Sequence, residues 1–152
     1  MRLSRGNVRG WGSLECGRVP LTELIIQYTA ADVDVTVPAL LIRINRLFRH
    51  TMTADELYEA TRGTWKIGPR RQGARYAFSV FNGVVREVYA IESWHPAGTT
   101  EYVSRDAATL KRDRWEFLGR VAEAAVRDAY LGGSVALHFR QGRQSPTKYV
   151  NC

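Results

Sequence analysis

The chain has 152 residues, of which 45% are hydrophobic and 24% charged, and this composition excludes a disordered chain and predicts one globular domain. No apolar run approaches the roughly 20 residues that cross a bilayer, and the first residues lack the apolar core of a signal peptide, so we expect a cytoplasmic protein with no membrane partner. The net charge of +7 favours an anionic partner, with nucleic acid as the first choice.

In the N-terminal third, the sequence predicts a flexible arm followed by two strands. Residues 1–18 are rich in glycine and arginine without periodicity, which predicts a flexible arm before a single domain over residues 19–152. The apolar run within 21–28 is too short to separate a strand from a helical turn. Alternating valines over 33–37 predict a half-buried strand, and the apolar run 39–45 predicts a buried strand.

A helix is expected to begin after Thr53. Thr53 and Glu56 have the spacing of a capping box, in which each side chain bonds the backbone of the other residue. Gly63 is expected to end this helix, since glycine can adopt the left-handed conformation that often follows a last turn. Residues 65–67 then predict a short extended piece, and Gly68–Pro69 predicts a turn.

A hairpin is the clearest local structure in the sequence. Residues 76–81 and 84–91 are aromatic and β-branched, and Asn82–Gly83 between them favours a two-residue turn. This loop places Phe78 opposite Glu87. The predicted core face of the ribbon then carries Tyr76, Phe78, Val80, Val85, Tyr89 and Ile91.

The C-terminal part predicts a strand, a helix and two short pieces. Residues 114–118 are typical of a strand, and 120–130 of a helix with one packed face. Short apolar segments follow at 135–139 and 149–151. The complete order predicts an α+β fold, with a small curved mixed sheet or open β-barrel and two flanking helices.

The positive charge is distributed unevenly. The stretch from Arg62 to Arg86 contains no acidic residue, and neither does the chain from Ala129 onward. If the two stretches converge, they form a channel for a phosphate backbone; the alternative is two separate solvated basic loops, with an arginine content set by the genome. The candidate nucleic-acid contacts are Arg62, Lys66, Arg70, Arg71, Arg75, Arg143 and Lys148.

Aromatic residues alternate with these cations. Indole and phenol rings stack on bases, arginine neutralises phosphate, and a side-chain amide reads a base edge. The candidate base-pocket residues are Trp65, Trp94, Tyr149 and Asn151. Core packing is the alternative explanation for each tryptophan.

Catalytic motifs are scarce. The three histidines and two cysteines lack the close spacing of metal ligands, and no nucleotide-binding fingerprint is present, so no metal or cofactor is expected. His95 is the best acid-base candidate by position. The alternative function is therefore a small nuclease or base-processing hydrolase that uses His95 with a carboxylate. A third alternative is an accessory protein whose basic face binds an acidic partner.

Residues 55–68 (DELYEATRGTWKIG), followed by 83–89 (GVVREVY) and 91–94 (IESW), resemble the PUA-like superfamily, which includes the EVE, YTH, ASCH and SRA domains. The resemblance covers about residues 38–151. It implies a curved sheet that binds DNA or RNA and reads one modified base in an aromatic-lined pocket. By position it makes Trp65 and Trp94 pocket walls. The phosphate contacts that it implies are Arg62, Lys66, Arg70 and Arg71. Bacterial relatives occur with restriction nucleases, which implies a nuclease as a possible associate.

Overall fold

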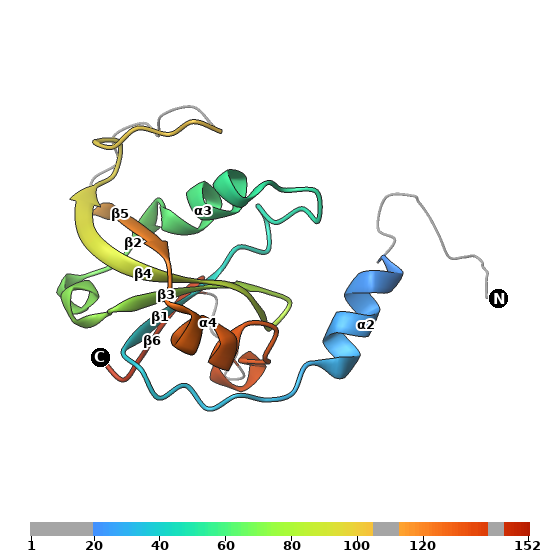
Figure 1. Ribbon diagram of the computed structural model, residues 1–152. Helices are drawn as coiled ribbons and strands as arrows, with labels where there is room; N and C mark the ends of the chain where they lie inside the picture. Colours follow the sequence, from blue (N-terminus) through green and yellow to red (C-terminus); the bar gives the residue numbers. More distant parts are fainter. Residues whose placement is uncertain (1–19, 105–112, 140–144) are drawn as a thin grey trace.

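The structure is a computed structural model that describes residues 20–104, 113–139 and 145–152. Within these ranges it contains three α-helices and a six-stranded mixed sheet that curves into a nearly closed barrel (Figure 1). The strand order is β2 (Trp65–Lys66), β5 (Arg114–Val121), β4 (Val84–Pro96), β3 (Tyr76–Phe81), β1 (Ala39–Arg43) and β6 (Thr147–Val150). The α+β class and the curved sheet predicted from the sequence are confirmed.

Strand β1, which lies between β3 and β6, explains the buried run of the sequence. It pairs in parallel with β3 and antiparallel with β6, and its residues from Ala39 to Ile42 are fully buried. Alternate residues of β1 therefore enter two cores, one on each face of the sheet. Leu41 packs with Phe78 on the face that α4 (Ala124–Tyr130) covers, and Leu40 packs with Phe117 beneath α3 (Ala54–Arg62).

The hairpin between β3 and β4 contains a bulge. The turn residues Asn82 and Gly83 have φ values of 51° and 78°, as a two-residue turn requires. The pairing shifts between Ser79 and Val80, which leaves Arg86 without a direct partner. Phe78 consequently lies opposite Val88, and the predicted pairing with Glu87 is wrong. Because a one-residue shift turns later side chains to the other face, Tyr89 and Ile91 belong to the core beneath α3 instead of the predicted face.

Helix α3 begins as predicted, but the glycine that follows it has a different role from the one expected. Thr53 Oγ1 accepts a hydrogen bond from Glu56 N at 3.1 Å, and Thr53 N donates to Glu56 Oε1 at 2.8 Å, which confirms the capping box. Gly63 follows the helix with an extended φ of 179°, so it does not adopt the expected left-handed conformation. A Cβ at this position would lie 2.5 Å from Tyr102 Oη, and close packing therefore explains the glycine.

Several other boundaries differ from those expected. Residues 21–28 belong to helix α2 (Leu21–Thr29), and 33–37 form no strand, although Val35 is buried. Helix α4 begins at Ala124 because β5 continues to Val121. Short 3₁₀ helices, η1 (Pro69–Gly73) and η2 (Ala136–Phe139), occur at the predicted turn and in the first C-terminal piece. The predicted arm lies outside the described residues. Among those residues, no helix has the length and apolar character to cross a membrane.

Candidate nucleic-acid interface

A cavity of about 360 Å³ lies between η1 and β4. β3 begins at Tyr76, which pairs with Ala90 of β4. One residue further along β4, Ile91 N donates a hydrogen bond to Arg75 O, just before β3. Beyond Ile91, β4 still pairs with β5 on one edge, but its other edge faces η1 instead of a strand. The cavity is lined by Gln72, Ala74, Arg75, Tyr76, Ala90, Ile91, Glu92, Ser93, Trp94, Arg120 and Glu123. This gap in the sheet is large enough for a small planar ligand.

A second, more open cavity of about 570 Å³ lies on the other side of η1. Its lining includes Lys66, Arg71 and Trp115. The Arg71 guanidinium carbon is 3.4 Å from the centroid of the Trp115 ring, and Arg71 Nη1 donates to Gly68 O at 3.0 Å. The cation is thus held over an aromatic plane. Our sequence analysis did not select Trp115.

Residues from the two acid-free stretches meet at η1. The Arg70 guanidinium carbon lies 4.6 Å from the centroid of the Tyr149 ring, and Arg70 Nη2 donates to the carbonyl oxygen of Cys152. Lys148 is exposed, but strand alternation turns it to the opposite face of β6 from Tyr149. Arg143 lies outside the described residues. Convergence of the two stretches is therefore seen at Arg70 and Tyr149.

The two selected tryptophans occupy different environments. Trp65 is 9% exposed, belongs to the core beneath α3, and donates through Nε1 to Thr61 O at 2.7 Å. Trp94 is half-buried, lines the first cavity, and packs edge-on against Phe117 with ring centroids 5.4 Å apart. Its Nε1 is buried and has no hydrogen-bond partner among the described residues. A buried donor without an acceptor is unfavourable, so an acceptor that reached this atom would stabilise it.

Two other selected residues have internal roles. Arg62 is 2% exposed; it donates to Thr100 Oγ1 at 2.7 Å and to the carbonyl oxygen of Glu101. This corrects its expected position, since a phosphate contact needs a guanidinium at the surface. The Asn151 side-chain amide donates to Val35 O at 2.8 Å and Val37 O at 3.1 Å, so it holds the segment before β1 and does not present a free edge to a base.

Buried carboxylates hold the segment 98–104 beside Arg62. Glu116 accepts from Gly98 N, from the backbone and hydroxyl of Thr100, and from Tyr102 Oη. Glu59 accepts from the backbone of Val103 and from the backbone and hydroxyl of Ser104. Burial opposes the charged form of both carboxyls, but these hydrogen bonds outweigh it and keep both pKa values below the ordinary 4.5.

The hydrolase alternative finds little support in the geometry. His95 Nε2 lies 2.8 Å from Ser93 Oγ. Its cross-strand neighbour Glu116 already uses both oxygens to hold the segment 98–104. Across the described ranges, no group of three histidine, cysteine or acidic side chains could hold a metal ion.

The chain matches no protein-family model, no curated protein and no solved structure in the comparisons. The chemistry of the site must therefore be argued from its own residues. Around η1 these are exposed cations (Lys66, Arg70 and Arg75), the Arg71–Trp115 stack and the indole of Trp94. Together they offer phosphate neutralisation, a stacking plane and a buried indole donor that has no partner among the described residues.

Proposed function

We propose that this protein is a nucleic-acid-binding module of the PUA-like type, which binds the phosphate backbone at η1 and holds one base, modified or not, in the cavity between η1 and β4. The observation that carries the proposal is the position of η1. Its arginines stand between two cavities, each of which has a tryptophan in its lining. Cations and aromatic planes in alternation are the combination that single strands and extruded bases require.

Within this proposal the residues divide into two groups. Lys66, Arg70 and Arg75 are exposed and carry no acidic neighbour in sequence, so they serve as phosphate contacts. Trp94 forms a wall of the base site, and its unpartnered Nε1 donates to an acceptor on the base edge. The curved mixed sheet and its helices are consistent with the PUA-like resemblance.

Binding of labelled single-stranded and double-stranded DNA and RNA, measured by fluorescence anisotropy over a range of salt concentrations, tests the proposal. With three phosphate contacts, log K should fall against log[salt] with a slope of about −2 to −3. Arg70→Ala should reduce the magnitude of that slope by about 1. Arg46→Ala, at an exposed arginine outside the two cavities, is the matched control and should leave it unchanged. A slope near zero for the unaltered protein would refute nucleic-acid binding.

Trp94→Phe tests the base site separately. The variant retains an aromatic ring against Phe117 and loses the Nε1 donor. We expect an affinity loss of about fivefold for the preferred oligonucleotide, the size of one hydrogen bond, with an unchanged salt slope. Equal affinity of the variant for every oligonucleotide would remove Trp94 from the base site and leave the backbone contacts in place.

A further inference from the structure

Helix α2 presents its apolar side chains to solvent. Leu21, Leu24, Ile25 and Tyr28 recur at the spacing of one helical face, and all four are exposed, with Tyr28 at 89%. Single exposed leucines are common on protein surfaces, but four apolar residues on one short helix form a patch. We refer to these four residues as the α2 apolar face.

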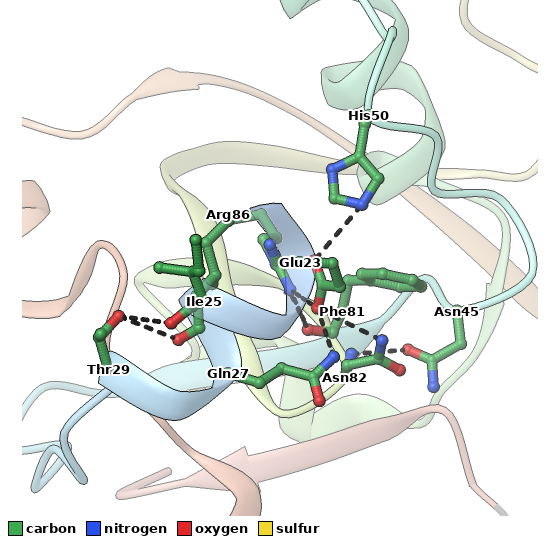
Figure 2. A network of polar contacts seen from close by, with 10 residues as sticks. Glu23, Ile25, Gln27, Thr29, Asn45, His50, Phe81, Asn82 and Arg86 are labelled. Atoms are coloured by element: carbon green, nitrogen blue, oxygen red, sulfur yellow. Dashed lines mark hydrogen bonds and ion pairs between the residues drawn. The ribbon is translucent and has the colours of Figure 1, made fainter. Parts of the chain in front are cut away.

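A polar network on the other side fixes the helix in this orientation (Figure 2). Glu23 is 1% exposed and accepts from Arg86 Nη2 at 2.7 Å and from Gln27 Nε2 at 2.6 Å. Asn82 Nδ2 lies 3.4 Å from the same oxygen, and His50 Nε2 lies 3.4 Å from the other. Rotating α2 to bury its apolar face would separate the buried Glu23–Arg86 pair, which is strongly unfavourable.

Cover of the apolar face from outside the barrel would stabilise α2. Helix α2 has nine residues, and isolated helices of that length are marginal in water. Glu23 is its one buried residue, so α2 gains little apolar burial from the rest of the described chain. Covering the face would supply that missing burial.

Charges at the two ends of α2 indicate what covers it. Beside the first turn lies His50, with exposed Arg46 and Arg49 in the same segment; Arg49 is also ion-paired with Glu56. After the last turn come Asp32 and Asp34, both exposed. The α2 apolar face is thus uncharged along its length, with exposed cations in the segment that contacts its first turn through His50 and exposed acids in the segment that follows its last turn.

We infer that the α2 apolar face pairs with the α2 apolar face of a second copy of this chain, antiparallel about a two-fold axis. A two-fold contact brings opposite ends of the two helices together. The aspartates that follow α2 in one copy then lie toward the segment of Arg46 and Arg49 in the other, and the two helix dipoles oppose each other favourably. In this arrangement the Tyr28 ring of each copy covers the region of Leu21 in its partner.

Sedimentation equilibrium of the full chain over a wide concentration range tests this pairing. We expect the weight-average mass to rise from that of the 17.2 kDa monomer toward twice that value. Tyr28→Lys should raise the dimer dissociation constant about tenfold or more, as loss of an interface anchor does. Val103→Lys is the matched control, since Val103 is 88% exposed, and it should leave association unchanged. Both side chains are almost fully exposed, so neither variant should change the circular dichroism spectrum.

A charge exchange tests the antiparallel geometry. Asp34→Arg should weaken association by placing like charges together, and adding Arg46→Asp to it should restore association. A constant monomer mass at the highest concentration would overturn the inference and indicate that the chain's own first 19 residues or an unlike partner covers the face. Equal dimerisation of the Tyr28 and Val103 variants would also overturn it. Neither outcome bears on nucleic-acid binding at η1, which lies elsewhere on the barrel.

Discussion

Replacement of Glu116 by glutamine tests how the buried polar network supports the fold. Glu116 is fully buried on β5, and its two oxygens accept four hydrogen bonds from residues 98–102. The hydroxyl of Thr100 also accepts from Arg62 Nη1 at 2.7 Å, so it links the buried guanidinium to the buried carboxylate. Glu116→Gln keeps the volume of the side chain and removes its charge and one acceptor oxygen.

The hydrogen-bond geometry gives the size of the effect. Oε1 accepts hydrogen bonds from Gly98 N at 2.9 Å and from Tyr102 Oη at 3.0 Å, and Oε2 accepts from the backbone N–H and the hydroxyl of Thr100. In the glutamine variant, two of these donors face an amide NH₂ instead of an acceptor. Each hydrogen bond to a charged group contributes about 1.5–3 kcal/mol, and breaking a buried charge network costs about 3–5 kcal/mol. We therefore expect the free energy of unfolding to fall by about 3–5 kcal/mol.

Urea unfolding at neutral pH, followed by tryptophan fluorescence and far-ultraviolet circular dichroism, measures this difference. Glu92→Gln is the matched control, because Glu92 forms an exposed ion pair with Arg120. Such pairs contribute about 0–1 kcal/mol. If Glu116→Gln changes the free energy of unfolding no more than Glu92→Gln does, the network does not support the fold as argued.

Two further predictions concern the same part of the fold. Thr53→Ala removes the hydroxyl of the capping box and should lower the free energy of unfolding by about 1 kcal/mol, measured by the same urea titration; an unchanged midpoint would contradict this. The folded-state pKa values of Glu59 and Glu116 lie below the ordinary 4.5, so the unfolded chain binds more protons at acidic pH. The contribution of these two carboxylates to the free energy of unfolding should be present above about pH 4.5 and should be lost as the pH drops through their folded-state pKa values. Urea midpoints that stay constant down to pH 3 would refute this.

Local signals in the sequence predicted the elements well, and contacts distant in sequence produced the differences. The turn at Asn82–Gly83 and the capping box at Thr53 depend on neighbouring residues and are both present. The bulge at Arg86 has no local signal. Arg86 Nη2 donates to Glu23 Oε2, and Glu23 comes from a helix 63 residues earlier in the chain. The pairing register therefore could not be read from the hairpin alone.

Candidate site residues show the same limit. The acid-free run drew attention to the chain around η1, where the proposed interface lies, because a run of charge is a local property. Arg62 belongs to the same run but lies inside, and a signal for this was available, since Tyr58 precedes it by one helical turn and Arg62 packs over that ring at 5.5 Å. Trp115 could have been found from the strand period, because Trp115 and Phe117 alternate onto one face of β5.

The position of β1 has a consequence for how the chain completes its fold during synthesis. Among the described strands β1 is synthesised first, yet its partners are β3 and β6, and Ala39 pairs with both Tyr76 and Val150. Until residues 147–150 are available, one edge of this apolar strand has no strand beside it. Exposed apolar strand edges are templates for aggregation, so a nascent chain depends on rapid synthesis of β6 after β1. Residues 147–150 thus protect β1.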